Sequence, residues 1–239
     1  MKPKKILMII SAFIFNEVAA ANKSFESDTL DSKQRSIVSI SAFTAKGDLP
    51  GLKQALIEGL QSGLTINEVK EELIHLSAYC GFPRSLNGIN TFNAVLTDRK
   101  SKGIKDPEGE QPSKVAETNK YQTGKKLLES LTGRPETGPK TGYAAFVPAI
   151  DTLLKEHLFN DIFKRGVLDF KQRELTTISA LTALGGVESQ LGGHLGICLN
   201  LGFTAPQLRQ VISMIEAKIG KKEADAGKLV LEKILAARN

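Results

Sequence analysis

The side chains best suited to proton chemistry lie in two stretches of the chain. Glu174 and His194 lie in the second half, and a carboxylate beside an imidazole can accept and return protons near neutral pH. Tyr79 and Cys80 lie in the first half, where a phenol can hydrogen-bond an oxyanion and a thiol of lowered pKa can act as acid or nucleophile. We predict that Glu174, His194 and Cys80 are catalytic.

Three residues are predicted to line a substrate site. Tyr79 is the first, and His75 lies one helical turn before it, preceded by two glutamates. An exposed Glu-His pair on a helix surface is the alternative for His75. Cys198 lies four residues after His194, on the same helical face, although a small buried apolar side chain is its alternative role. We predict that Tyr79, His75 and Cys198 bind substrate.

The acid and the imidazole also have structural alternatives. Glu174 can be a charge favoured by a helix N-terminus or a surface partner of Arg173. His194 can be a satisfied core histidine, and Tyr79 and Cys80 can be core residues. Arg134 and Arg84 are candidates to hold a substrate carboxylate.

One helical sequence pattern occurs twice in the chain. Residues 35–45 and 173–183 share this pattern, and each is followed by a matching stop at 63–65 and 202–204. A repeat of this size indicates one ancestral helical unit that was duplicated and fused.

The reactive side chains are divided between the two copies. Each is replaced by an unreactive or different residue at the corresponding place in the other copy, which predicts one composite active site per chain. The corresponding pairs are Glu174 with Ser36, His194 with Ala55, Tyr79 with Lys218, and Cys80 with Ile219.

The N-terminus has the features of a secretory signal peptide. Lysines precede an apolar run from Ile6 to Phe15, which is too short to span a bilayer comfortably, and Ala19 to Ala21 supply a cleavage site. We predict cleavage after Ala21, export to the periplasm of a Gram-negative source, and a mature protein without membrane contact. An uncleaved anchor is the alternative.

The composition is that of a globular protein, with 41% hydrophobic residues. The formal net charge is +6, but the basic residues are scattered and lack interleaved aromatic residues, so nucleic-acid binding is not expected. The two cysteines form no CxxC motif, and no His, Cys and Asp cluster has zinc-site spacing, so no metal is predicted. Cys80 and Cys198 can form one disulfide or remain thiols.

The hydrophobic periodicity and the capping signals predict an all-α protein with no strand. We divide it into a signal peptide at 1–21, a first helical repeat at 22–100, a linker region with one helix at 101–140, and a second helical repeat at 141–239. The expected helices are 32–45, 52–62, 65 to a break at 81–83, 84–100, 121–131, 148–158, 160–163, 169–184, 188–201, 206–217 and 221–237.

Residues 173–186, followed by His194 and 200–204, resemble the carboxymuconolactone decarboxylase family, and residues 78–83 resemble the same family's downstream turn. The resemblance implies an all-α fold related to the alkylhydroperoxidase D proteins, here as two tandem repeats packed as a pseudo-dimer. Family members commonly form rings of six units, which implies a homotrimer for a chain with two units.

The resemblance implies either decarboxylation of a carboxylated muconolactone or, in another branch, thiol-based peroxide reduction. The second branch uses a CxxC just before the histidine, and residues 187–190 contain no cysteine here. We predict a cofactor-independent lyase or isomerase that acts by proton transfer on a small carboxylated lactone or unsaturated acid. No cofactor is needed, because a vinylogous carbonyl can hold the electrons left by carbon dioxide. The alternatives are a thiol peroxidase that uses Cys80 and a non-catalytic periplasmic binding protein.

Overall fold

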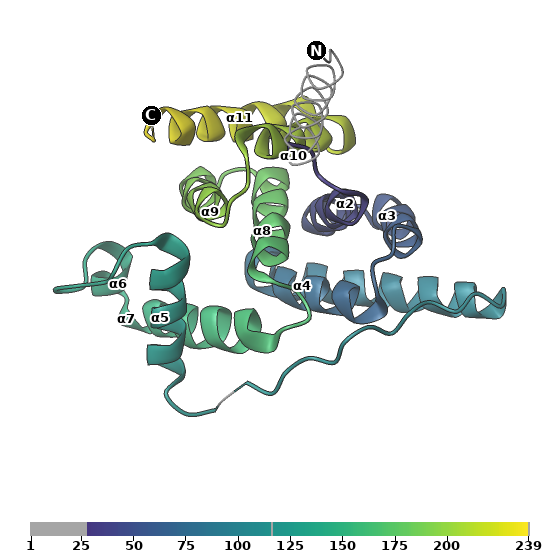
Figure 1. The fold of residues 1–239 in the computed structure, drawn as a ribbon, viewed down its shortest axis with the longest axis horizontal. Coiled ribbons are helices and arrows are strands. Elements are labelled where there is room, and N and C mark those ends of the chain that lie inside the picture. Colours follow the sequence, from purple (N-terminus) through teal and green to yellow (C-terminus); the bar gives the residue numbers. More distant parts are fainter. Residues whose placement is uncertain (1–27, 116, 239) are drawn as a thin grey trace, which may run out of the picture.

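The structure is a computed structural model that describes residues 28–115 and 117–238 (Figure 1). Every regular element in these residues is a helix, which confirms the predicted all-α class. The predicted signal peptide, residues 1–21, lies outside the described residues. Among the described helices, none is both long and apolar enough to cross a membrane.

The first series of helices comprises α2 (Ser32–Lys46), α3 (Leu49–Gln61) and α4 (Ile66–Ser101). Asp31 caps α2 by accepting a hydrogen bond from the Gln34 backbone N–H, and Gly47 ends this helix in the left-handed conformation at φ 74°. Thr65 caps α4 in the same way as Asp31 caps α2. These caps set the helix ends that the sequence signals predict.

Of two predicted helix boundaries in this series, one is confirmed and one is wrong. The predicted interruption of α4 is confirmed, because Gly81 adopts φ 82° and ψ 155° and Pro83 follows it. The predicted start of the second helix at Leu52 is wrong, since α3 begins at Leu49. Pro50 is accepted there because the first helical turn needs no N–H from it, and Asp48 caps the helix through the Gly51 N–H.

A middle segment connects the two series. It contains α5 (Lys120–Thr132), α6 (Gly142–Phe146), α7 (Pro148–Leu153), the π-helical η1 (Leu154–Ile162) and the 3₁₀ turn η2 (Phe163–Arg165). The predicted helices 148–158 and 160–163 are wrong in form, since the chain runs from α7 through a wider π-helix, and α6 was not predicted. Sequence periodicity does not distinguish an α-helix from a π-helix over so short a segment.

The second series comprises α8 (Phe170–Leu184), α9 (Glu188–Asn200), α10 (Ala205–Lys218) and α11 (Lys221–Ala236). Its caps correspond to those of the first series. Asp169 caps α8 through a capping box with Gln172, and Thr204 caps α10 through one with Gln207.

The helices of the two series pack against each other across the centre of the molecule. Helix α8 lies there and packs on α2, while α4 packs on α8 and α10 packs on α2 (Figure 1). The main hydrophobic core draws its buried residues from both series, including Ile37, Leu73, Leu175 and Leu195. This packing brings α4 of the first series against α8 and so places Tyr79 near residues of the second series.

Candidate functional site

The carboxylate of Glu174 and the imidazole of His194 form a hydrogen-bonded pair. Glu174 Oε2 on α8 lies 2.7 Å from His194 Nδ1 on α9. The Glu174 side chain is fully buried, whereas 14% of the His194 side chain remains exposed. An ionised carboxylate only accepts hydrogen bonds, so Nδ1 carries the hydrogen and Nε2 is left with a free lone pair. Such a histidine is oriented to take up a proton at Nε2.

Tyr79 and His75 of α4 join this pair through their rings. The Tyr79 ring meets the His194 ring edge-on, with centroids 5.5 Å apart at 78°, and lies 5.1 Å from the His75 ring. Burial and the negative charge of Glu174 raise the pKa of Tyr79 well above its ordinary value. Tyr79 is therefore a hydrogen-bond donor near neutral pH.

The protonation state of His75 follows from its contacts. The Thr177 hydroxyl donates to the Arg173 carbonyl at 2.9 Å, so its oxygen accepts the hydrogen bond from His75 Nε2 at 2.8 Å. Burial, together with the charges of Arg173 and His194, lowers the pKa of His75 well below its ordinary value. His75 is consequently neutral, with Nδ1 unprotonated.

Three polar atoms of this group are buried and find no hydrogen-bond partner among the described residues. They are Oε1 of Glu174, the hydroxyl of Tyr79 and Nδ1 of His75. Buried polar atoms in native proteins are nearly always paired, so a polar ligand group or a solvent molecule is expected at these positions. Together they offer two acceptors and one donor.

The expectation of an exposed Glu-His pair is wrong. His75 and the two glutamates before it, Glu71 and Glu72, are all buried. The carboxylate of Glu71 receives a fork of hydrogen bonds from Arg165 at 2.8–3.0 Å and one at 3.4 Å from Arg173. The sequence pattern missed this arrangement because the two arginines lie far along the chain.

Arg173 has a structural position. Its guanidinium is fully buried, pairs with Glu71 and donates to the Gly166 carbonyl at 2.9 Å. The alternative in which Arg173 is a surface partner of Glu174 is therefore wrong. These ionic contacts connect α4, the turn before α8, and α8 itself, and so fix the backbone on both sides of the site.

The two cysteines are free thiols in the structure. Cys80 is half-buried, its Sγ donates to the Leu76 carbonyl, and burial raises its pKa to about 11, although Arg84 acts in the opposite direction. Burial and the charge of Glu174 raise the pKa of Cys198, which is a core residue. Both thiols are protonated near neutral pH, which disfavours nucleophilic or redox chemistry.

The site is covered by apolar residues of the middle segment. Leu131 of α5 and Phe159 of η1 belong to a second hydrophobic cluster that packs against Tyr79. Phe163 lies 5.0 Å from His75, ring to ring. Phe159 and Phe163 are spaced one helical turn apart, but the sequence does not show that they pack over residues of α4.

A groove of about 620 Å³ lies between α9, α11 and the end of α5. Its lining includes Gly193, the residue before His194 on α9, but not His194, Glu174 or Tyr79. Arg134, Lys233 and Arg238 bring three positive charges to its lining against the single negative charge of Glu188. Its size and charge suit a small anionic molecule.

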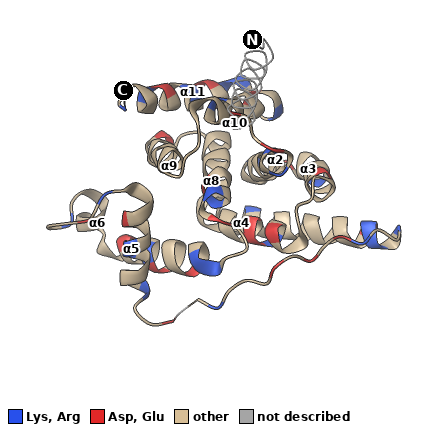
Figure 2. Ribbon diagram, viewed as in Figure 1, with Lys and Arg blue, Asp and Glu red and all other residues tan. Residues whose placement is uncertain are grey.

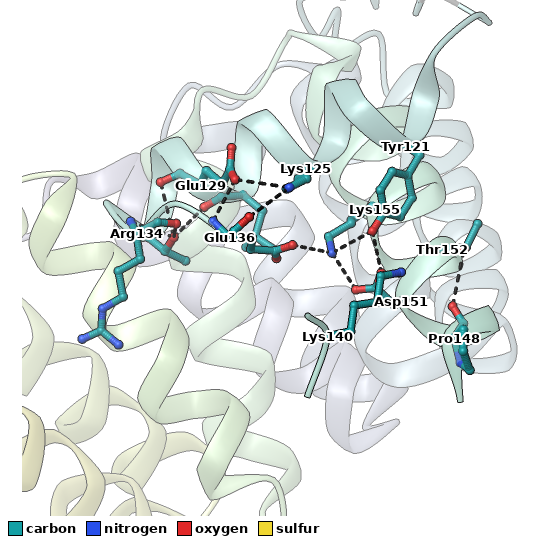
Figure 3. A network of polar contacts seen from close by, with 12 residues as sticks. Tyr121, Lys125, Glu129, Arg134, Glu136, Lys140, Pro148, Asp151, Thr152 and Lys155 are labelled. Carbon is teal, nitrogen blue, oxygen red and sulfur yellow. Dashed lines mark hydrogen bonds and ion pairs between the residues drawn. The ribbon is translucent and has the colours of Figure 1, made fainter. Parts of the chain in front are cut away.

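The loop that carries Arg134 is held by the polar network of Figure 3. Lys155 is almost fully buried and binds Asp151 at 2.6 Å and Glu136 at 2.7 Å, while the Tyr121 hydroxyl donates to Asp151 at 2.7 Å. This network ties residues 133–141 to α5, α7 and η1, which fixes the loop from which Arg134 extends (Figure 3).

Side chains that could bind a metal ion do not cluster in the described part of the chain. No group of three or more His, Cys, Asp or Glu side chains has metal-binding geometry in residues 28–115 and 117–238. Blue and red segments are interspersed along the helices in Figure 2.

Comparison with known proteins gives a family match that covers part of this site. The model of the carboxymuconolactone decarboxylase family matches residues 148–233, which include Glu174, His194 and Cys198 but not Tyr79. No curated protein matches the chain. The all-helical fold and this match support the resemblance found in the sequence, and the second helical series, with its acid–imidazole pair, is similar to the carboxymuconolactone decarboxylase family.

Proposed function

We propose that this protein is a cofactor-independent lyase or isomerase that moves protons on a small carboxylated lactone or unsaturated acid. The observation that carries the proposal is the contact of 2.7 Å between Glu174 Oε2 and His194 Nδ1. A buried carboxylate that holds one imidazole nitrogen leaves the other nitrogen available as a general base.

The proposed reaction starts with removal of a proton from a carbon next to the conjugated carbonyl of the substrate. His194 Nε2 takes the proton, and the negative charge of Glu174 stabilises the resulting imidazolium. The electron pair moves onto the carbonyl oxygen, to which the Tyr79 hydroxyl donates a hydrogen bond. The imidazolium then returns the proton to another carbon of the conjugated system. In a decarboxylation, loss of carbon dioxide supplies the electron pair and a protonated His194 donates the proton.

We assign binding of the substrate carboxylate to the groove that Gly193 lines, next to His194 in the chain. Arg134, held through the network of Figure 3, and Arg238 are suited to bind a carboxylate. Arg238 already donates to the Gly196 carbonyl and to Asn200 Oδ1, so its guanidinium is oriented within the groove. The apolar cover of α5 and η1 would exclude water from the reacting atoms.

The test is a turnover assay on a panel of carboxylated lactones and unsaturated dicarboxylic acids, followed by carbon dioxide release and by absorbance. Wild-type protein should convert at least one member, and His194→Ala should reduce the rate by roughly 10²–10⁴-fold. His157→Ala is the matched control, because His157 is an exposed histidine on η1. Equal rates for wild type and His194→Ala would reject the proposal, and binding without turnover would indicate a binding protein instead.

We also propose that the chain forms a homotrimer. Two separate apolar surfaces support this assembly, one on α6 and α7 and one on the second half of α4. Phe146 is 89% exposed on the first surface and Phe82 is 62% exposed on the second. Contact between two different surfaces of identical chains gives a head-to-tail ring when the rotation between them closes. Light scattering should give the mass of three chains, and Phe146→Asp should reduce it to one.

We also propose that the mature protein is periplasmic, because residues 1–21 have the features of a signal peptide. N-terminal sequencing of protein secreted by a Gram-negative host should begin at Asn22, whereas an intact N-terminus on a membrane-bound product would contradict export by cleavage.

A further inference from the structure

A second cavity, of about 410 Å³, lies between α2, α3 and α10 on the first helical series. We call it the twin pocket. Its lining includes Arg35, Ser36, Ser39, Ala55 and Lys218. No function described above uses this cavity.

The position of the twin pocket follows from the internal repeat. When the helix caps Asp31 and Asp169 are aligned, Ser36 corresponds to Glu174, and when Thr65 and Thr204 are aligned, Lys218 corresponds to Tyr79. The lining therefore repeats the positions of the proton-transfer site. The further pairs are Arg35 with Arg173, Ser39 with Thr177, Ala55 with His194, and Met214 with His75.

The substitutions remove proton-transfer chemistry from the twin pocket. The carboxylate has become the Ser36 hydroxyl, and the imidazole has become the Ala55 methyl group. Neither side chain can act as a general acid or base near neutral pH. The pocket retains volume, because Ala55 is smaller than the histidine to which it corresponds.

The twin pocket has two positively charged residues, Arg35 and Lys218, at the positions that correspond to Arg173 and Tyr79. Arg35, whose counterpart Arg173 is buried with Glu71, is exposed here and donates to the Leu30 carbonyl. Lys218 is also exposed, and its ammonium lies 5.7 Å from the centre of the Phe43 ring. Glu58 is the acidic residue of the lining, and its Oε1 accepts from Gln54 at 2.9 Å. Two cations against one carboxylate favour an anionic ligand.

The twin pocket and the site at Glu174 also differ in their access to solvent. The site at Glu174 lies beneath the apolar cluster of α5 and η1, whereas the lining of the twin pocket includes the exposed residues Arg35 and Lys218. A ligand therefore reaches the twin pocket without displacement of α5.

We propose that the twin pocket is a non-catalytic binding site for a small carboxylate, held by Lys218 and Arg35. The choice of a carboxylate rests on these cations and also on the proposed function, in which the corresponding residues of the second series act on a carboxylated substrate. The pocket binds the anion and leaves it unchanged.

The experiment is a titration of the full chain with fumarate, followed by two-dimensional amide NMR. The amide signals of Ser36, Ser39 and Ser62 should shift with saturation, whereas the neutral analogue fumaramide should not shift them. Lys218→Gln should weaken the fumarate affinity read from these signals by roughly fivefold. Lys222→Gln is the matched control, because Lys222 is an exposed lysine outside the pocket, and it should leave the affinity unchanged.

The two sites report through different signals, so failure of one proposal is distinguishable from failure of the other. The signals of Gly193 and Gly196 report the groove between α9 and α11, and those of Ser36 and Ser39 report the twin pocket. Unmoved serine signals, equal shifts with fumaramide, or an unchanged affinity in Lys218→Gln would each overturn the twin-pocket proposal. None of these results bears on turnover at His194.

Discussion

His194 Nδ1 lies 2.7 Å from Glu174 Oε2, so a histidine of α9 is held by a fully buried carboxylate of α8. The two helices are joined by a short turn at residues 185–187. The carboxylate accepts the hydrogen bond that orients the imidazole ring, so a change at Glu174 should alter His194.

Glu174→Gln tests this dependence at nearly constant side-chain volume. The amide cannot stabilise an imidazolium as a carboxylate does, so turnover should fall by roughly 10²–10⁴-fold. Helical content measured by circular dichroism should remain that of wild type. Turnover within twofold of wild type would show that the carboxylate has only a structural role.

Loss of the buried charge on Glu71 should destabilise the fold. Glu71→Gln leaves Arg173 buried without its ionic partner, so the free energy of unfolding should fall by about 3–5 kcal/mol. Glu108→Gln removes an exposed pair with Lys70 and should cost less than about 1 kcal/mol. Chemical denaturation measures both values, and equal losses would contradict the account of this cluster.

Two glycines should respond oppositely to alanine. A Cβ at Gly124 on α5 would come 1.8 Å from the Lys155 carbonyl oxygen, so Gly124→Ala should shift backbone and cost about 1–3 kcal/mol or more. A Cβ at Gly193 on α9 meets nothing within 4 Å, so Gly193→Ala should stabilise the helix by up to about 1 kcal/mol. Because Gly193 lines the groove, the same change should weaken carboxylate binding. Unchanged affinity would remove Gly193 from the binding surface.

Cys80 should be unreactive at neutral pH. With a pKa raised to about 11, only roughly one thiol in ten thousand is ionised at pH 7. Alkylation by iodoacetamide should therefore be slow and should accelerate up to about pH 11, and Cys80→Ser should retain turnover. Rapid alkylation at pH 7, or peroxide consumption that Cys80→Ser abolishes, would instead support thiol chemistry.

The Figure 3 network should make stability depend on pH in acid. Burial alone would raise the pKa of Asp151, but hydrogen bonds from Lys140, Lys155 and Tyr121 outweigh burial and lower it to about 2. A lowered pKa in the folded state gives stability that is present above the unfolded value, near 4, and is lost as pH falls through about 2. This loss should amount to about 2 kcal/mol. Denaturation curves between pH 5 and 2 should show it in wild type and not in Asp151→Asn.

The capping signals made most of the fold predictable from sequence. Asp31, Thr65, Asp169 and Thr204 cap helices whose expected starts, at 32, 65, 169 and 206, lie within one residue of the observed starts, because a cap depends on residues within one turn. The π-helix η1 was not predictable, since periodicity over nine residues does not distinguish it from an α-helix, and its close contact with Gly124 joins residues far apart in the sequence.

The sequence predicted which residues form the candidate site better than it predicted how they contact one another. Glu174, His194, Tyr79 and His75 come together as the split repeat indicates. The burial of His75 and the apolar cover by Phe163 depend on packing between helices that lie far apart in the sequence, so local patterns did not contain them.

The most direct test of the central claim is a single-turnover reaction in deuterium oxide with a carboxylated lactone that the wild-type protein converts. For a lactone that loses carbon dioxide, one deuterium is expected in the product at the carbon that receives the proton from His194, with no incorporation by His194→Ala and full incorporation by His157→Ala. Equal deuterium incorporation by wild type and His194→Ala would contradict the claim that the Glu174–His194 pair transfers the proton.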